Sequence, residues 1–440
     1  MSDTNFRSTV KELGWRVLFI FFFLLAVPLD WKYYRRLFQI DWGHLSYGAI
    51  FDLAHYVPGN GVLVLVVSLV GGVLWLAAGR LELRRDRLPA TDGGKERQYY
   101  WLRVIVRYRL AVGIIAYGFI KLFPLLSPYP SISNLNTDYG DFTRWKLFSL
   151  SLGIVPNYES FLGAVEIVSG LLLFWRKTAS VGAFIIAVFL GNVLMSNWAY
   201  GGGEAVYSLY LIGLALFVLS WDAGRLVNLL ILQRPASPNH FRPVFTERWQ
   251  RYGRLGLKGG LIFFFVLLYG FKTKEGAEYQ FPLSKGLPGA AGVYNVSLFV
   301  LGKDTLAYSK TDPVRWQDVV LEKWGTLSIR SNRPVVLDST NTERLDLPGE
   351  ERDYELRGSA ARHYYRYTVD TADRVLVLQN KNPHDAADKG VLHFDRPLET
   401  RIVLTGVLGG DSVYAVLDRV DKKYLLEEAR HRGREGGLSL

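Results

Sequence analysis

Long apolar runs fill most of the first 272 residues of this 440-residue chain, and they limit its fold more than any other feature. A helix that crosses a bilayer needs about 20 largely apolar residues, because it rises about 1.5 Å per residue through a hydrocarbon layer about 30 Å thick. The last run is short unless it extends backwards through 255–260. The runs predict seven transmembrane helices, at about residues 12–29, 60–79, 103–124, 158–175, 179–199, 205–221 and 259–271.

The first run begins behind Arg7 and Lys11, in the arrangement of a signal peptide. The sequence LLAVPLDW that follows offers no clear small-x-small cleavage site. We therefore expect this segment to be retained as a transmembrane helix.

The positive charge of the chain gathers around the apolar runs. The first 274 residues carry 29 Lys and Arg against 16 Asp and Glu, whereas the last 166 residues carry 23 against 25. Nucleic-acid-binding proteins are also basic, but positive charge that flanks apolar runs is what membrane topology requires. We therefore expect a lipid bilayer as the partner of this part of the chain, and no nucleic acid.

Three basic clusters predict the orientation of the helices. They follow the second run at 80–87, the fourth at 176–177 and the sixth at 225–258. The positive-inside rule places all three in the cytoplasm if the amino terminus is cytoplasmic and seven helices follow. Basic residues also occur at 32–36 and 144–146, in longer loops with a smaller bias. This orientation sends the carboxyl-terminal domain to the opposite, extracytoplasmic side.

Several kinds of cofactor site have no signature in the sequence. The chain has no cysteine, which excludes disulfides and cysteine-ligated iron–sulfur clusters. None of its seven histidines falls inside an apolar run, so paired histidine ligands for haem in the bundle are not expected. No P-loop and no H-E-x-x-H metal motif occurs. The sequence therefore leaves the cofactor of this protein unknown.

The loop at 125–157 is rich in Pro, Asn, Ser and aromatic residues. Because it is long for an unstructured connection, we expect it to pack over the helix bundle as an interfacial cap.

From about residue 290 the sequence alternates between apolar and polar residues, which predicts β-strands. Glycines in LGGDS, at 408–412, favour a hairpin turn because glycine accepts a positive φ. Residues 312–324 look like the one helix or aromatic-rich excursion. An antiparallel small barrel or sandwich is predicted, with strands in YNVSLFVL, TLSIRS, HYYRYTV, RVLVLQ, VLHFD, RIVLTGVL and SVYAVLDRV.

Polar side chains inside the apolar runs are the candidate site. Charges in a bilayer are costly, by about 3 kcal/mol, and usually face protein and a partner. Glu166 lies between Gly163 and Gly170, which would let a neighbouring helix approach it closely. Lys121 and Tyr117 share one stripe of the 103–124 run. We predict a buried polar cluster of Glu166, Tyr117, Lys121 and Asn192 that opens outwards.

Other polar residues are secondary candidates. Arg107 shares the stripe of Tyr117 and Lys121 but lies towards the cytoplasm, and Asn197 lies well around its helix from Asn192. The full secondary set is Arg107, Tyr139, Asp141, Asn197 and Tyr200. Two interpretations of the cluster stay open: hydrogen bonds that only hold helices together, or a site for a proton, a quinone or another ligand.

The apolar runs from the third to the sixth resemble the DoxX family of bacterial and archaeal membrane proteins. The resemblance is carried by RYRLAVGIIAYGFIKLFP, LNTDYGDF, FLGAVEIVSGLLLFWRKTASVGA, GNVLMSNWAY and SWDAGRLVNLLILQRP. It implies a four-helix core over 101–235, with two preceding helices in 1–100, a basic loop and seventh helix in 236–275, and a β-rich extracytoplasmic domain in 276–440. It also implies the bacterial inner membrane. Family members often carry an acidic-Pro-Val-Lys stretch where this chain reads YGGGEAVYS, with Glu204 and no lysine.

The resemblance leaves two functions to consider. One is a non-catalytic accessory subunit or scaffold whose β-domain binds another envelope or periplasmic protein. The other is a subunit of a quinone-linked membrane oxidoreductase, of the thiosulfate:quinone or oxidant-defence type, with quinone bound in the helix bundle. No catalytic residue and no metal ligand is assigned, and the sequence favours the first function because no set of cofactor ligands is visible.

Overall fold

The computed structural model describes residues 2–85, 93–237, 247–276, 281–337 and 349–432. The chain divides into two compact units. The first is helical and consists of Met1–Phe123, Ser160–Ala199 and Glu204–Gly276. The second contains the strands and consists of Pro124–Glu159, Tyr200–Gly203 and Ala277–Leu440.

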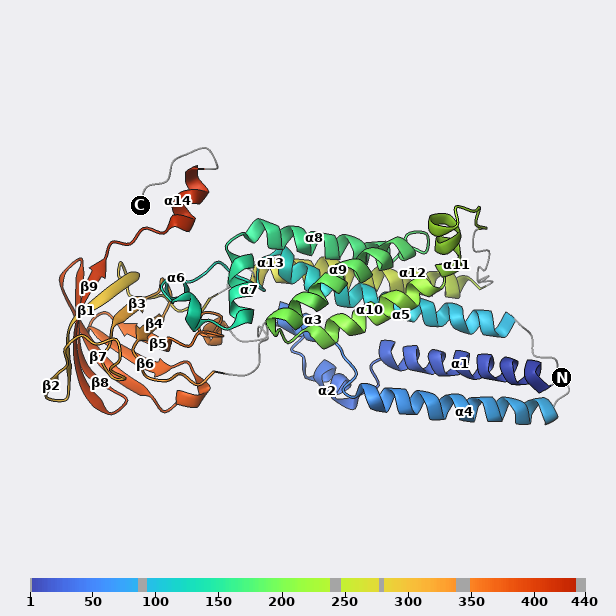
Figure 1. The fold of residues 1–440 in the computed structure, drawn as a ribbon, viewed down its shortest axis with the longest axis horizontal. Helices are drawn as coiled ribbons and strands as arrows, with labels where there is room; N and C mark the ends of the chain where they lie inside the picture. The colour runs from blue at the N-terminus through green and yellow to red at the C-terminus, as the bar shows by residue number, and fades with distance from the viewer. Residues whose placement is uncertain (1, 86–92, 238–246, 277–280, 338–348, 433–440) are drawn as a thin grey trace. The chain divides into compact units, whose positions relative to one another are not determined.

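All seven predicted apolar runs form helices, and the last extends back to Arg248 (Figure 1). Trp31–Gln39 (α2) and Tyr47–Ala54 (α3) were not among the predictions. The helices that cover the runs are α1 (Ser2–Ala26), α4 (Gly61–Arg85), α5 (Gly93–Leu122), α8 (Pro156–Leu172), α9 (Ala179–Tyr200), α10 (Ala205–Ser220), and the continuous α12 (Arg248–Ile262), η3 (Phe263–Leu268) and α13 (Tyr269–Gly276).

Several of these helices are long and apolar enough to cross a membrane, which favours membrane association. Among the described residues four segments qualify: Arg7–Gln39, Gly61–Arg80, Ala179–Tyr200 and Arg248–Gly276. A fifth is present if α10 and the bent continuation Ala223–Ile231 (α11 and η2), at 73° to it, count as one. The helix α8 has only 17 residues, and α5 carries several basic side chains in its apolar stretch.

Small residues let the helices of the first unit pack closely. A Cβ atom on Gly72 of α4 would lie 2.5 Å from a methyl group of Val17 in α1. A Cβ on Gly170 of α8 would lie 2.5 Å from Ile115 of α5. Both α1 and α10 pack against α5, whose side chains Leu102, Val106 and Ile114 are almost fully buried. The helix α5 is therefore a central helix of this unit.

The second unit contains a closed antiparallel barrel of eight strands. Successive strands pair along the chain, except that β3 pairs with β1 and not with its predecessor β2. The strand β1 closes the barrel by pairing with β9, from Val293 opposite Val420 to Leu301 opposite Val413. The short β2 (Asp304–Thr305) adds to the end of β1. The barrel strands are β1 (Gly292–Leu301), β3 (Asp318–Leu321), β4 (Thr326–Arg330), β5 (Arg362–Asp370), β6 (Val375–Asn380), β7 (Lys389–Leu398), β8 (Arg401–Leu408) and β9 (Asp411–Val420).

Inward-facing apolar side chains fill the barrel. The core includes Phe299, Trp316, Tyr367, Leu392 and Leu417, each at most 7% exposed. The predicted hairpin at 408–412 is confirmed, with Gly409 and Gly410 at φ values of 64° and 95° between β8 and β9. The alternative of a sandwich is wrong, because β1 pairs with both β3 and β9.

The expected helix or excursion at 312–324 contains a strand. Asp318–Leu321 forms β3, between β1 and β4. Before it, Asp312 accepts hydrogen bonds from the backbone of Val314 and Arg315 and makes a turn. The guanidinium of Arg315 donates to the carbonyl groups of Leu306 and Val296, which holds this turn against the barrel.

The segment 124–159 belongs to the same compact unit as the barrel, and the expectation that it caps the helix bundle stays a prediction. Ser133 donates from its backbone N–H and its hydroxyl to Glu322 of the barrel unit, at 2.7 and 2.6 Å. Arg362 of β5 donates to the carbonyl of Asn136 at 2.9 Å. Burial raises the pKa of Glu322 above its usual value, and the hydrogen bonds from Ser133 oppose this rise.

Candidate functional site

Glu166 lies where α8 and α5 approach most closely. A Cβ atom on Gly163 would lie 2.4 Å from the backbone oxygen of Gly118 and 2.4 Å from the backbone nitrogen of Leu122. A Cβ on Gly118 would in turn lie 2.6 Å from Ile167. Contact this close is available only to glycine. The prediction that small residues turn Glu166 towards protein is confirmed, since Glu166 is 1% exposed.

Lys121 of α5 forms an ion pair with Glu166. Its Nζ lies 2.5 Å from Oε1 of Glu166, and the two side chains are 9% and 1% exposed. The ammonium group also lies 5.9 Å from the ring centre of Tyr117 and 5.7 Å from that of Phe189. Burying a charge is costly unless it is paired, so the pair accounts for the presence of both residues inside the bundle.

A second acid and a histidine extend the cluster beyond the predicted residues. His55 Nε2 lies 3.3 Å from Oε2 of Glu204, which directly precedes α10. The hydroxyl group of Tyr117 interacts with the same carboxylate. The aromatic rings of this group pack against one another. The ring centre of Tyr207 lies 4.2 Å from that of His55 and 5.3 Å from that of Tyr117.

The two asparagines of α9 have the opposite roles to those predicted. Asn192 is exposed, and its side chain accepts a bond only from Ser196 among the described residues, at 3.4 Å. Asn197 is buried and accepts the backbone N–H of Glu204 at 3.1 Å. The two positions lie about 140° apart around the helix, because each residue turns it by about 100°. Asn197, not Asn192, therefore supports the cluster.

Of the other secondary candidates, Arg107 lies far from Lys121 on the same helix, and the remaining three belong to the other unit. Arg107 is 14 residues before Lys121 on α5, which is about 21 Å along the helix axis. This separation agrees with the prediction that Arg107 lies too far along the helix to join the cluster. Tyr139, Asp141 and Tyr200 belong to the barrel unit. Tyr139 is 78% exposed, the backbone oxygen of Asp141 accepts the N–H of Ala360, and Tyr200 stacks on Phe148.

The cluster has a simple charge balance. Lys121 and Glu166 neutralise one another, which leaves the carboxylate of Glu204 in contact with His55. One carboxyl oxygen of Glu166 and the hydroxyl of Tyr207 are buried without a hydrogen-bond partner among the described residues. Such a set of neighbouring acids, a base and hydroxyls can hold and pass a proton.

Sequence reasoning missed Glu204, His55 and Tyr207 as partners. His55 and Glu204 are 149 residues apart and both lie outside the apolar runs, so no helical spacing connects them. The signal that was available is the acid in YGGGEAVYS, at the entrance to an otherwise apolar helix.

No group of three or more His, Cys, Asp or Glu side chains that could hold a metal ion occurs among the described residues. Comparison of the chain with models of protein families, with curated proteins and with solved structures gave no match.

Proposed function

We propose that this chain is a multi-pass membrane protein similar to the DoxX family that acts as a non-catalytic accessory subunit or scaffold of an envelope complex. In this proposal the helical unit is the anchor in the inner membrane, and the β-barrel binds a protein partner outside the cytoplasm. Seven helices cross the bilayer, so the barrel lies on the side opposite to the basic loops.

The burial of the charges on α5 supports the count of seven. Lys121 pairs with Glu166, Arg103 pairs with Asp222 at 3.1 Å, and Arg109 donates to the hydroxyl of Tyr210 at 3.2 Å. These three basic side chains are at most 9% exposed. Charges that are satisfied inside the bundle are not presented to hydrocarbon, and the fourth buried basic residue of α5, Arg107, also faces protein at 8% exposed. The low mean hydropathy of α5 is therefore no obstacle to crossing.

A row of exposed valines on the barrel carries the proposed binding role. Val377 of β6 pairs with Val391 of β7, and Val391 pairs with Val407 of β8. They are 51%, 45% and 48% exposed, so three apolar side chains in register cover the outside of three neighbouring strands. Exposed apolar patches of this kind are typical of surfaces that contact another protein. The interior of the barrel is packed, which leaves its outer surface for recognition.

Substitution within this row tests the proposal. We expect Val391→Lys to reduce the size of the complex that the full chain forms in native membranes, as judged by native electrophoresis. The control Thr371→Lys places the same charge at an exposed turn of the barrel and should leave the complex intact. Equal migration of both variants and the unmodified chain would contradict the role of this surface.

The alternative proposal is a quinone-linked oxidoreductase subunit, and the cluster around Glu166 favours it. A quinone that takes two electrons from a reduced substrate such as thiosulfate must also take up two protons, which Glu204 with His55 could supply at the edge of the bundle. Here Glu204→Gln should abolish quinone-dependent activity in the membrane while the protein stays inserted. The control Asn192→Leu changes an exposed polar residue of α9 and should have no effect. Activity that persists in Glu204→Gln would rule out this role for Glu204.

A further inference from the structure

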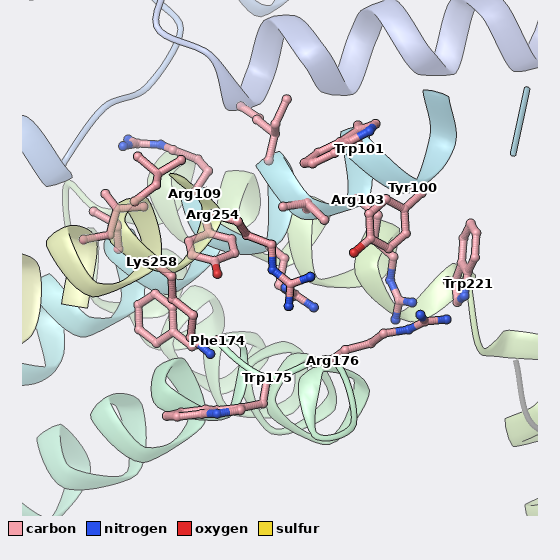
Figure 2. A pocket seen from close by; sticks show the side chains of 18 of the residues that line it. Tyr100, Trp101, Arg103, Arg109, Phe174, Trp175, Arg176, Trp221, Arg254 and Lys258 are labelled. Carbon is pink, nitrogen blue, oxygen red and sulfur yellow. The ribbon is translucent and has the colours of Figure 1, made fainter. Parts of the chain in front are cut away.

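The helical unit contains a cavity of about 1810 Å³ that runs along residues 97–112 of α5. Residues of α5, the 174–181 turn, the 221–229 segment, α12 and η3 line it (Figure 2), together with Ala26, Pro28, Tyr33 and Leu53. Its position is distinct from the Glu166 cluster, because none of the residues of that cluster lines it.

The lining of this cavity is strongly basic. Asp222 is its one acidic residue, and it is already shared by Arg103 and Arg225, each at 3.1 Å. Nine lining residues are Lys or Arg: Arg97, Arg103, Arg107, Arg109, Arg176, Lys177, Arg225, Arg254 and Lys258. The cavity therefore has a large excess of positive charge, which an anion would neutralise.

Arg107 lies deep in this cluster of like charges. It is 8% exposed, and its Nε has no hydrogen-bond partner among the described residues. Arg107 and Arg176 are close enough to Arg103 to repel it, and Lys258 is repelled by Arg107 and Arg254. Figure 2 shows the guanidinium ends of Arg103 and Arg176 directed towards one another beside Trp221. Guanidinium groups that converge in this way are suited to phosphate oxygens.

The rim of the cavity is apolar and aromatic. Val181, Leu229 and Leu257 line it and are 55%, 51% and 69% exposed. Trp175 and Trp249 line it too, at 51% and 72% exposed, and Lys258 Nζ lies 4.4 Å from the ring centre of Trp175. Tryptophan prefers the level of the lipid headgroups. A ligand with a charged head and apolar tails fits this arrangement better than a small soluble anion.

We propose that this cavity binds the headgroup of an anionic membrane phospholipid that carries two phosphates, with its acyl chains along the exposed apolar rim. Basic pockets between transmembrane helices on the cytoplasmic side are suited to such headgroups. Two phosphates match the charge excess better than one. The inference rests on the proposed membrane location of the helical unit.

The test compares lipids on the purified full chain in a nonionic detergent. Cardiolipin, phosphatidylglycerol and phosphatidylcholine are added in turn, and binding is followed by native mass spectrometry and by the midpoint of thermal unfolding. We expect cardiolipin to bind most tightly and to raise the midpoint, and phosphatidylcholine to do neither. Inorganic pyrophosphate is the soluble comparison. Stabilisation by pyrophosphate that equals that by cardiolipin would overturn the lipid proposal in favour of a soluble phosphate ligand.

Variants locate the effect. Arg107→Gln and Arg176→Gln should each lower the affinity for cardiolipin by about fivefold, since a basic side chain near an anionic lipid contributes about 1 kcal/mol. Arg176 is only half-buried, so its variant tests the site even if Arg107→Gln does not fold. The control Arg248→Gln removes an exposed charge of α12 that does not line the cavity. Equal affinities in all three variants would contradict the proposal. Release of the unmodified chain from membranes by alkaline carbonate would instead contradict the membrane location.

Discussion

Lys121 Nζ lies 2.5 Å from Glu166 Oε1 inside the helix bundle, and both side chains are almost fully buried. Replacement of one partner leaves the other charge buried and unpaired, which costs about 3 kcal/mol. We therefore expect Glu166→Gln to lower the midpoint of thermal unfolding markedly, as measured by the fluorescence of the native tryptophans. The double variant Lys121→Met with Glu166→Gln should recover most of the loss. A single variant as stable as the unmodified chain would show that the pair is not needed for stability.

The contact between α5 and α8 depends on Gly163. We expect Gly163→Ala to destabilise the protein by about 2 kcal/mol, because the new Cβ would overlap the backbone of the neighbouring helix and force the helices apart. Gly191→Ala is the matched control, since a Cβ at that position of α9 meets no atom within 4 Å. The measurement is the midpoint of thermal unfolding of each variant in detergent, which should be lower for Gly163→Ala than for Gly191→Ala. Equal midpoints would mean that the two helices are not this close.

Asn197 is expected to matter where Asn192 does not. Asn197→Leu removes the acceptor for the backbone N–H of Glu204 and should lower stability by about 1 kcal/mol or more, because a buried donor is left unpaired. Asn192→Leu changes an exposed position and should be nearly neutral. Thermal unfolding of both variants measures the difference, and the reverse order would restore the sequence-based prediction for Asn192.

Arg362 connects the 124–159 segment to the barrel. It is fully buried and donates to Asp318 at 2.5 Å and to the carbonyl of Asn136 at 2.9 Å. Arg362→Met should destabilise the barrel unit by about 3 kcal/mol and increase hydrogen exchange in residues 131–137. The control Arg401→Met breaks an exposed pair with Asp418 and should cost far less, because solvent screens exposed ion pairs. No change in exchange would contradict this attachment.

The stability of the barrel should depend on the protonation of His363. Burial and the neighbouring Arg333 guanidinium, 2.9 Å from Nδ1, lower the pKa of His363 below its usual 6.5. The unfolded chain then binds the proton more readily, so stability falls as the pH falls below about 6.5. The pKa of Asp388 is lowered too, because hydrogen bonds from Tyr365 and Arg333 outweigh its desolvation, but its effect appears at more acidic pH.

Comparison with His363→Gln isolates this effect. The unfolding midpoint of the unmodified chain should drop more between pH 8 and pH 5.5 than that of the variant. Parallel pH profiles would show that His363 is not the group responsible.

Much of the fold could be predicted from the sequence, because apolar length and alternation are local properties. The helices follow the apolar runs, and seven of the strands follow the alternating segments. The strand β3 was missed because DVVL is short and buried along nearly its whole length, so its residues do not alternate. The number of membrane crossings stays a prediction.

The candidate site was predictable only in part. Glu166 and Lys121 carry opposite charges inside apolar helices, so each needs a partner of opposite charge. Gly163 indicated which face of α8 packs against a neighbouring helix. The choice between Asn192 and Asn197 depends on how α9 is rotated, and α9 is apolar on all sides, so the sequence does not fix that rotation. His55 and Glu204 come together only through the tertiary fold.

The central claim, that the barrel and the basic loops lie on opposite sides of a membrane, is tested most directly by single cysteines in this cysteine-free chain. Ser412→Cys lies in the exposed turn region of the barrel, and Ala223→Cys is exposed beside the basic cavity. In intact cells whose outer envelope is permeable to it, a maleimide that cannot cross the inner membrane should label position 412 and leave position 223 unlabelled until the membrane is opened. Labelling of position 223 in sealed cells, or protection of position 412, would contradict the account.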